Sequence, residues 1–447
     1  MRISIPENVK TALDLIERNG YSAYIVGGCV RDCAMGKEPH DWDMTTSSPP
    51  GETERIFSSF RVIPTGIKHG TVTVIIDGTQ IEITTMRTDG DYLDSRHPEN
   101  VSFTDDINED LSRRDFTINA IAYNPATGAI DPFGGLEDIK NRRIKCVGDP
   151  DRRFGEDALR VLRAIRFSSV LDFEIEEKTA GSVIRNRALL KNISAERKRD
   201  ELVKLLCGRN VEDVLTKYSE VIFTVIPELE ALNGFDQRTP YHIYDIWLHT
   251  VKVVSAIKNT RELKVAALLH DIGKPDKFTV DENGCGHFKG HPEVSERMSR
   301  EILGRLKFSN EEIMTICLAV RYHDLRPDGT KRQLVKWCSK YGMDNIRNAV
   351  EIMKADAAAQ NPDFFEKRNE LYRKTDLILD EIKDRKLCLT LKELRVDGND
   401  MAAMGLSGRD IGAALEFLLD SVLDGKLDND RKKLLSAAES EFRSKLK

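Results

Sequence analysis

The chain has 447 residues, of which 40% are hydrophobic and 32% charged, and its formal net charge is −6. This composition argues against a disordered protein, and the absence of a run of about 18 apolar residues argues against a membrane span. Eight scattered cysteines without a CxxC pair favour a reducing cytoplasm over a disulfide framework.

The N-terminal segment alternates helix and strand signals. An amphipathic helix ends near Gly20, a strand follows over residues 21–26, and residues 50–60 indicate another helix. Two alternating strands, 71–77 and 80–87, flank an Asp-Gly pair, which is a strong hairpin signal. This segment is therefore predicted to be a mixed α/β unit.

The rest of the chain carries mainly helical signals. Residues 88–112 are polar and weakly periodic, which predicts a loop, and strand signals nearly vanish after residue 150. We expect an α+β fold with four domains. They are a small mixed-sheet head over 1–145, a helical neck and body over 146–236, a third helical domain over 237–365 and a helical tail over 366–447.

Basic residues are concentrated in one part of the chain. Residues 141–210 contain 17 Lys and Arg against 11 Asp and Glu, a local charge of +6 that leaves −12 for the remainder. A basic segment on an acidic protein is typical of a polyanion-binding surface. A solvated, arginine-rich helical face is the alternative.

Two aspartates follow a glycine turn near the N-terminus. Gly27 and Gly28 end an apolar strand, and Asp41 and Asp43 follow with one residue between them. Alternate side chains of a strand share a face, so these carboxylates repel each other unless a cation lies between them. Paired glycines let a backbone approach phosphates closely. The pattern predicts a divalent metal, a triphosphate and a reaction at phosphorus, although an isolated DxD is usually a surface turn.

A third carboxylate often completes such a site. Glu82 is the candidate, because Ile81 and Ile83 would face the core and Glu82 the opposite side. A solvent-facing strand residue is the alternative. Arg113 and Arg114 precede an apolar stretch that is expected to be a helix.

These two arginines can clamp a triphosphate through bidentate hydrogen bonds. The next residue, Asp115, can accept a hydrogen bond from a ribose hydroxyl. Ordinary charged flanks of a helix N-terminus are the alternative.

Asp157 and Arg160 are predicted to share a helix face at i and i+3. One interpretation is an intrahelical ion pair. The other is a base reader, because a carboxylate only accepts hydrogen bonds and a guanidinium only donates them. Cytosine and adenine both offer an amino donor beside a ring-nitrogen acceptor, whereas guanine and uracil present the reverse. One Asp/Arg pair would therefore admit C and A and reject G and U.

Six motifs in order over residues 20–205 resemble the bacterial tRNA nucleotidyltransferases of the DNA polymerase beta superfamily. They are GGxVRD, DWDMTT, RRDFTINA, DPFGG, EDALRVLRAIRF and SAERKRDEL. The resemblance implies Mg²⁺ at Asp41 and Asp43, with CTP and ATP extending a tRNA 3′ end to CCA without a nucleic-acid template. The candidate nucleotide-binding residues are Gly27, Gly28, Arg31, Asp32, Arg113, Arg114, Asp115, Asn119, Asp157, Arg160, Arg163 and Arg166.

Several activities share these motifs. CCA-adding, CC-adding and A-adding enzymes are alternatives, and bacterial poly(A) polymerases are close relatives. By resemblance, CC-only members lack a loop before RRD, and that loop is present here, with Asp89, Tyr92, Asp94 and residues 96–98. This favours CCA or A addition, and residues 65–74 look more like the tRNA enzymes.

A second candidate site lies in the helical half. Six of the nine histidines fall within residues 242–323, and the order H…HD…D resembles the HD phosphohydrolase superfamily. The implied ligands of an unidentified divalent metal are His249, His270, Asp271 and Asp356, with His291 and His323 nearby. A satisfied core histidine is the alternative for each one. Hydrolysis of phosphomonoesters or 2′,3′-cyclic phosphates stays open, because such domains also serve as packing modules.

Two rivals to a transferase function remain. A metal-dependent phosphohydrolase whose head only tethers RNA is one, and an inactive RNA-binding scaffold is the other. The family resemblance suggests that the C-terminal helical run contacts the tRNA elbow, whereas a packing domain without RNA contact is the alternative. The oligomeric state is not predicted.

Overall fold

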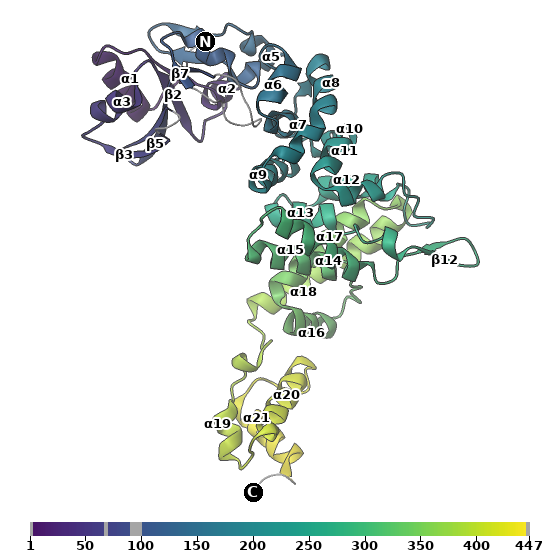
Figure 1. The fold of residues 1–447 in the computed structure, drawn as a ribbon. Coiled ribbons are helices and arrows are strands. Elements are labelled where there is room, and N and C mark those ends of the chain that lie inside the picture. Colours follow the sequence, from purple (N-terminus) through teal and green to yellow (C-terminus); the bar gives the residue numbers. More distant parts are fainter. Residues whose placement is uncertain (1–2, 67–69, 90–100, 444–447) are drawn as a thin grey trace. The chain divides into compact units, whose positions relative to one another are not determined.

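The computed structural model describes residues 3–66, 70–89 and 101–443, and it divides into two compact units, 1–227 and 228–447 (Figure 1). The fold class is α+β as predicted, with the large mixed sheet in the N-terminal part and helices dominating the rest. The finer division into head, neck, third domain and tail stays a prediction.

A seven-stranded mixed sheet forms the head, in the order β3-β4-β5-β2-β1-β8-β9. Strands β2 and β5 run parallel, and the other neighbours run antiparallel. The strands are β1 Ala23–Val26, β2 Trp42–Thr46, β3 Arg61–Gly66, β4 Thr71–Ile76, β5 Thr79–Thr85, β8 Ala122–Asn124 and β9 Gly128–Ile130. The accompanying helices are α1 Glu7–Arg18, α2 Gly28–Ala34, α3 Pro50–Ile56, α4 Ile107–Ser112 and α5 Gly135–Lys140.

The predicted hairpin is confirmed. Asp77 and Gly78 join β4 to β5, and both have positive φ, +48° and +79°, which suits the tight turn that matches strand twist. Ile81 and Ile83 are buried and Glu82 between them is exposed, as the alternation predicts. This places Glu82 on the side of β5 away from the core.

The prediction of a loop over residues 88–112 is wrong for the described parts of that segment. Strand β6 Arg87–Asp89 pairs with β7 Val101–Phe103, and helix α4 follows. The Asp106 side chain caps α4 by accepting from the Asn108 amide, and Leu111 is fully buried. The acidic residues of α4 obscured the helical spacing of its apolar residues, so the sequence did not predict this helix. Tyr92, Asp94 and residues 96–98 lie outside the described residues.

Helices follow the head in the first unit, as predicted. They are α6 Pro150–Glu156, α7 Leu159–Leu171, α8 Glu177–Asn186, α9 Ala195–Leu206, α10 Val211–Lys217 and α11 Ser219–Val225. A two-residue parallel pair, β10 Arg143–Ile144 and β11 Glu174–Ile175, accompanies them. Helix α7 is buried over most of its surface, and the Ser169 hydroxyl donates to the Leu205 carbonyl of α9. A Cβ at Gly208 would lie 2.1 Å from the Ser169 hydroxyl, so this contact requires glycine.

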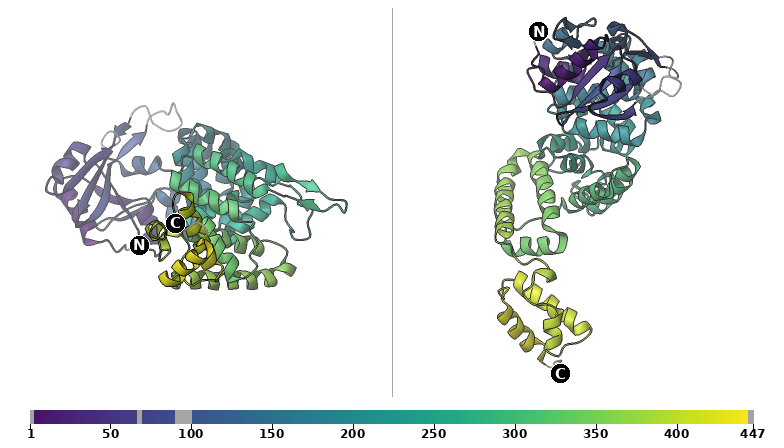
Figure 2. Two further views of the ribbon diagram at one scale, coloured as in Figure 1. Left: turned by 90° about the horizontal axis from the view of Figure 1, so that it is seen from below. Right: turned by 90° about the vertical axis from the view of Figure 1, so that its left-hand side faces the viewer.

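The second unit is helical apart from one short hairpin. Strands β12 Thr279–Val280 and β13 Gly286–His287 form this hairpin, which extends away from the helices of its unit in Figure 1 and Figure 2. The helices are α12 Ile246–Ala256, α13 Arg261–Leu269, α14 His291–Arg305, α15 Asn310–Tyr322, α16 Lys331–Tyr341, α17 Met343–Ala358, α18 Phe365–Asp384, α19 Gly398–Ala403, α20 Arg409–Leu423 and α21 Arg431–Glu441. The second unit also contains the 3-10 turns η5 Pro275–Lys277, η6 Pro362–Phe364 and η7 Leu391–Glu393. The first unit contains η2 Thr117–Asn119 and η3 Arg187–Asn192, and η4 Pro227–Leu232 lies where the two units meet along the chain.

Two apolar clusters hold the C-terminal helices. Leu334, Val350 and Leu379 join α16, α17 and α18, whereas Met401 and Leu434 belong to a separate cluster of α19, α20 and α21. Helix α18 therefore packs with the helices that precede it.

In the described part of the chain, no helix combines the length and the apolar character that crossing a membrane requires.

Candidate functional site

A cavity of about 680 Å³ in the first unit brings most of the predicted head residues together. Its walls come from the glycine turn, the start of β2, the segment after α4, and helices α7 and α9. The predicted residues that line it are Gly27, Gly28, Arg31, Asp41, Asp43, Arg113, Arg114, Asp115, Asn119, Asp157, Arg160, Arg163 and Arg166. Asp32 and Glu82 do not line it.

Asp41 and Asp43 line this cavity, and a third carboxylate, Glu82, lies next to them on the sheet. Asp43 lies on β2, Asp41 directly precedes that strand, and Glu82 is the register partner of Asp43 on β5. The pKa of the Asp43 carboxyl is raised, first by burial and then by the charges of Glu82 and Asp41, while Arg114 acts in the opposite direction. Crowded carboxylate oxygens are the donor set that suits Mg²⁺. These residues therefore fit the metal that the sequence predicts.

An arginine from another part of the chain, Arg114, contacts the glycine turn. Gly27 has φ +77°, and a Cβ there would lie 3.0 Å from Arg114 Nη1 and 4.0 Å from Asp43 Oδ2. The guanidinium of Arg114 therefore packs directly against the turn, beside the carboxylates. Its other nitrogen, Nη2, lies 3.3 Å from Asp110 Oδ2.

Asp110 is a buried anchor for both arginines of the RRD motif. Its Oδ1 accepts from Arg113 Nε and Nη2 at 3.0 and 2.8 Å. Burial opposes ionisation of Asp110, but Arg113 and Arg114 outweigh it and hold the pKa of the carboxyl below its usual range. The prediction of an apolar helix after these arginines is wrong, because only the three-residue 3-10 turn Thr117–Asn119 forms there.

A hydrogen-bonded chain connects the head to helix α7. Arg31 Nη1 donates to Asn119 Oδ1 at 2.8 Å, and Asn119 Nδ2 donates to Asp115 Oδ1 at 3.1 Å. Arg163 Nη2 donates to Asp115 Oδ2 at 2.6 Å. Asp115 is buried, which favours its neutral form, yet Arg163, with Asn119, lowers its pKa far below the usual range. The carboxylate that was predicted to face a ribose is therefore already engaged within the protein.

Asp157 and Arg160 do not pair with each other, and the expected shared helix face is wrong. Asp157 has an extended backbone between α6 and α7, where its carboxylate accepts from the Leu159 amide. Arg197 Nη2 of α9 lies 2.9 Å from Asp157 Oδ2. Arg160 donates instead to Glu156 Oε2 at 2.9 Å and to the Arg113 carbonyl at 2.8 Å. Both residues still line the cavity.

Four cavity residues were missed by the sequence reasoning: Leu159, Phe167, Arg197 and Lys204. The Arg166 guanidinium carbon lies 3.5 Å from the centroid of the Phe167 ring. Helical spacing offered a signal, because Phe167 lies four residues after Arg163 on α7. Arg197 and Lys204 lie on α9, whose contact with α7 only the tertiary structure reveals.

The four metal ligands implied by the HD resemblance lie close together in the second unit. His249, His270, Asp271 and Asp356 each offer a ligand atom, and these atoms all lie within 4.8 Å of one another. His249 Nε2 is 2.8 Å from Asp356 Oδ1 and 3.6 Å from Asp271 Oδ2. His270 Nε2 is a buried nitrogen without a hydrogen-bond partner. An unpartnered nitrogen facing two carboxylates fits a divalent metal.

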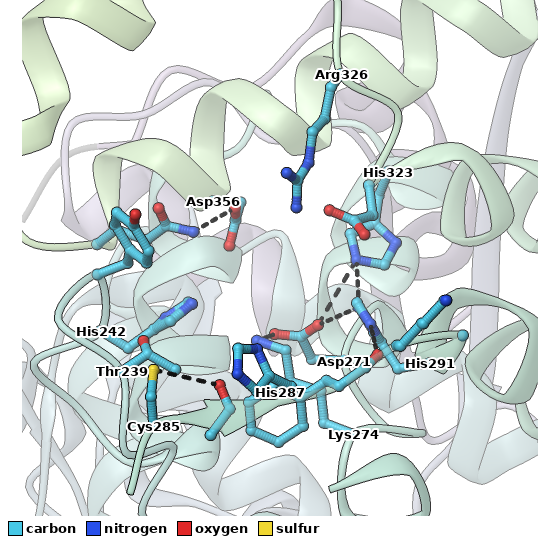
Figure 3. A pocket seen from close by; sticks show the side chains of 17 residues that line it. Thr239, His242, Asp271, Lys274, Cys285, His287, His291, His323, Arg326 and Asp356 are labelled. Carbon is cyan, nitrogen blue, oxygen red and sulfur yellow. Dashed lines mark hydrogen bonds and ion pairs between the residues drawn. The ribbon is translucent and has the colours of Figure 1, made fainter. Parts of the chain in front are cut away.

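A cavity of about 410 Å³ opens onto Asp271 and Asp356 of this cluster and onto the neighbouring His291 and His323 (Figure 3). Asp271, His291 and His323 point toward one another, and Asp356 lies across from them. Asp271 is buried, which raises a carboxyl pKa, but His270 and Lys274 outweigh burial and hold its pKa well below the usual range. Lys274 Nζ lies 2.6 Å from Asp271 Oδ2. The order of histidines and aspartates along the chain therefore correctly predicted that these side chains lie close together.

Comparisons with known proteins cover the same segments. Residues 23–145 match the poly A polymerase head domain, residues 172–232 match the probable RNA and SrmB-binding site of polymerase A, and residues 241–360 match the HD domain. The CCA-adding enzyme of Lactobacillus helveticus is 50% identical over 196 residues, which are 44% of this chain and 49% of that protein. The CCA-adding enzyme of Geobacillus kaustophilus is 48% identical over 217 residues, 48% of this chain and 53% of that one. The matched segment therefore spans about half the length of these curated relatives.

Solved structures extend the likeness over the whole chain. The Bacillus stearothermophilus CCA-adding enzyme in complex with CTP has a TM-score of 0.74 and 28% identity, with 98% of each chain covered. The Thermotoga maritima CCA-adding enzyme complexed with tRNA has a TM-score of 0.58 at 21% identity, with 99% and 100% covered, and this likeness concerns the fold. The chain thus combines a poly A polymerase head domain, its RNA-binding segment and an HD domain within the fold of the bacterial CCA-adding enzymes.

Proposed function

We propose that this chain is a template-independent tRNA nucleotidyltransferase that adds C, C and A to the tRNA 3′ end from CTP and ATP. The observation that carries the proposal is the head cavity, where Asp41 and Asp43 face a wall of arginines from the RRD motif and α7. The relatives named above as CCA-adding enzymes, one of them solved with CTP, support the substrates.

In the proposed reaction, the oxygen of the tRNA 3′-hydroxyl forms a bond to the α-phosphorus. The bond to the bridging oxygen breaks, pyrophosphate leaves with that electron pair, and the hydroxyl proton passes to water. Mg²⁺ held by Asp41 and Asp43 would supply charge neutralisation and a lowered pKa of the attacking hydroxyl. Glu82, the register partner of Asp43, is the third carboxylate of this arrangement.

The arginines would bind the triphosphate. Arg114 packs on the glycine turn, where the lack of a side chain leaves the backbone open to a phosphate, and Asp110 orients both Arg113 and Arg114. Arg31 is anchored through Asn119, so the Arg31 guanidinium is held at the cavity wall. Fixed positive charges next to the leaving pyrophosphate stabilise the transition state without reorganisation.

Base selection would fall to Asp157 and Arg160, each acting on the incoming base separately. Arg197 holds the Asp157 carboxylate, and Glu156 with the Arg113 carbonyl holds Arg160. These partners orient the acceptor and the donor that C and A require. Asp32 pairs with Arg31 at 2.8 Å and supports the arginine from outside the cavity. The basic segment would bind tRNA through phosphates and shape.

A single incorporation experiment tests this proposal. Purified protein is incubated with tRNA that ends before CCA, with CTP alone, ATP alone and both. We expect CC from CTP, no extension from ATP alone, and CCA from both. Long A tracts without C would favour a poly(A) polymerase, whereas CC-only or A-only products would favour a partial enzyme. Asp41→Ala and Asp43→Ala should abolish incorporation, and full incorporation in these variants would overturn the assignment.

A metal-dependent phosphohydrolase activity of the HD domain is a second proposed function. The unpartnered His270 Nε2 among His249, Asp271 and Asp356 favours it. Phosphomonoesters and 2′,3′-cyclic phosphates are the proposed substrate classes. His270→Ala and Asp271→Ala should lose hydrolysis while nucleotide incorporation continues, because the two functions use different residues. The scattered cysteines, without a CxxC pair, support our proposal of a cytoplasmic location.

A further inference from the structure

Three side chains of different chemistry meet on the hairpin of β12 and β13. Asp281, Cys285 and His287 each offer a ligand atom, and these atoms all lie within 4.8 Å of one another. Cys285 and His287 are two residues apart on one arm of the hairpin, so their side chains share a face. Asp281 follows β12 on the other arm, and its amide donates to the Cys285 carbonyl oxygen at 3.0 Å. These three residues, the hairpin group, include none of the HD ligands.

The turn of the hairpin orients the Asp281 carboxylate. Its Oδ1 accepts from the amides of Asn283 and Cys285 at 2.9 and 3.0 Å. Its Oδ2 lies 2.9 Å from His287 Nε2. The Cys285 thiol makes only a weak contact with the Gly286 carbonyl oxygen, at 3.9 Å from Sγ. The carboxylate is therefore held in place by the backbone, and the thiol keeps its capacity to bind a ligand.

Gly286 fixes the base of the hairpin to the rest of the second unit. Its amide donates to the Arg238 carbonyl oxygen at 2.8 Å. A Cβ at this position would lie 2.2 Å from the Gln237 carbonyl oxygen, so the contact requires glycine. Because Gly286 lies between Cys285 and His287, the backbone of both ligand positions is held before any ion binds.

A thiol, an imidazole and a carboxylate form a mixed donor set. Mg²⁺ and Ca²⁺ prefer oxygen ligands, whereas thiolate and imidazole are ligands that Zn²⁺ prefers. Tetrahedral Zn²⁺ holds its ligands at about 2.0–2.3 Å, which separates the ligand atoms from one another by about 3.3–3.8 Å. Small side-chain rotations bring atoms that already lie within 4.8 Å to these separations.

We propose that Asp281, Cys285 and His287 bind one Zn²⁺ ion on the hairpin. Cys285 binds as the thiolate, and its proton passes to water. Three protein ligands leave a coordination position that water or another ligand fills. An ion pair between Asp281 and a protonated His287 is the competing explanation of their contact, and it gives the thiol no role. The inference depends on neither the transferase nor the hydrolase proposal.

The proposed ion lies in the wall of the HD cavity. Cys285 and His287 both line this cavity (Figure 3). Lys274, which also lines it, donates to Gln237 Oε1 at 2.8 Å, and the Gln237 backbone is the part of the chain that packs against Gly286. The hairpin group therefore belongs to the same cavity as the HD ligands, although it consists of different residues.

Cobalt tests the site, because a thiolate bound to Co²⁺ produces a charge-transfer absorption band in the near ultraviolet. The HD ligands are histidines and aspartates, so Co²⁺ at the HD cluster gives no such band. Metal-free full-length protein is titrated with Co²⁺. We expect the band to appear, to disappear when Zn²⁺ displaces Co²⁺, and to persist in excess Mg²⁺.

Substitutions assign the band to the hairpin group. Cys285→Ser and His287→Ala should each lose it, whereas Asp271→Ala should keep it because the HD cluster is a separate site. Cys207→Ser is the matched control, since Cys207 is also a half-buried thiol but belongs to no candidate ligand group among the described residues. Far-UV circular dichroism establishes that the variants fold.

Alkylation provides a second measurement in a chain that keeps the thiol. Zn²⁺ should protect Cys285 from iodoacetamide, as read by peptide mass spectrometry, and His287→Ala should lose this protection. Protection of Cys207 to the same extent would indicate a general effect of Zn²⁺ and would contradict the site.

Three results would overturn the inference. A band that persists in Cys285→Ser would place the thiolate ligand at another cysteine. Loss of the band in Asp271→Ala would mean that Cys285 binds an ion of the HD cluster and that no separate hairpin site exists. The absence of both the band and the protection would leave Asp281 and His287 as an ordinary ion pair. None of these results bears on nucleotide incorporation or on hydrolysis, which are measured separately.

Discussion

Asp43 and Glu82 lie opposite each other on the parallel strands β2 and β5. Residues in register on parallel strands point to the same side of the sheet, so the two carboxylates are neighbours although 39 residues separate them along the chain. Their mutual repulsion contributes to the raised pKa of Asp43. Glu82 therefore lies beside the proposed metal ligand Asp43, although it does not line the cavity.

Neutralising these carboxylates separates their roles. Asp43→Asn should lower the rate of nucleotide incorporation by about 1,000-fold, because it removes a proposed direct metal ligand, and Glu82→Gln by about 10–100-fold. Single-turnover assays at saturating Mg²⁺ measure both rates. Asp77→Asn in the β4–β5 turn is the control, because asparagine tolerates the positive φ found there. A fully active Glu82→Gln would remove this residue from the catalytic group.

A methyl group at the glycine turn should disturb triphosphate binding. Gly27→Ala places a Cβ 3.0 Å from Arg114 Nη1 and should raise the KM for both CTP and ATP by about 10-fold. Gly36→Ala is a matched control, since Gly36 also has positive φ, +70°, but a Cβ there meets nothing within 4 Å. Steady-state incorporation kinetics compare the two. Equal KM values in both variants would mean that backbone strain, and not Arg114, causes the effect.

The buried Asp115–Arg163 pair should stabilise the first unit in a pH-dependent way. Because the pKa of Asp115 is lowered in the folded protein, its stabilisation is complete above the unfolded value of about 3.9 and is lost as pH falls through the folded value. Asp115→Asn should lower the free energy of unfolding by about 2–4 kcal/mol at pH 7, since it leaves Arg163 without its main partner. Urea unfolding at pH 7 and at pH 3 measures the difference, which should shrink at the lower pH.

Asp172→Asn serves as the control for this measurement. Asp172 is an exposed ion-pair partner of Arg142 in the left-handed region, φ +59°, which asparagine adopts readily. Its free energy of unfolding should change by less than about 0.5 kcal/mol. A similar loss in both variants would contradict a special role for the buried pair.

Base selectivity should depend on Asp157 and Arg160 more than tRNA affinity does. Asp157→Ala and Arg160→Ala should lower the preference for CTP and ATP over GTP and UTP by about 10–100-fold, because each removes one half of the hydrogen-bond pattern. Competition between nucleotides gives the selectivity, and filter binding gives the tRNA affinity. Arg197→Ala should show a smaller loss, since it removes the ion pair that orients Asp157 but leaves the Asp157 acceptor in place. Equal loss of selectivity and affinity would indicate a purely structural role.

Local patterns were reliable where neighbouring residues determine the outcome. The Asp77-Gly78 hairpin follows from turn chemistry, and the alternation around Glu82 follows from the two-residue period of a strand. The helix α4 was missed because acidic residues surround its buried Leu111, and its burial depends on packing that no local pattern encodes. The helix expected after Arg114 was an error of the same kind, because propensity yields to the tertiary position of Thr117–Asn119.

The sequence by itself determined the chemistry available to this protein: which residue types occur, in which order, and hence the resemblance to nucleotidyltransferases and to HD domains. Only the tertiary structure decided which side chains pair with one another. Asp157 pairs with Arg197 of α9 rather than with Arg160, and Asp271 serves two groups of histidines at once. The reason is physical: hydrogen bonds and ion pairs depend on distances between elements far apart in the chain, and packing sets those distances.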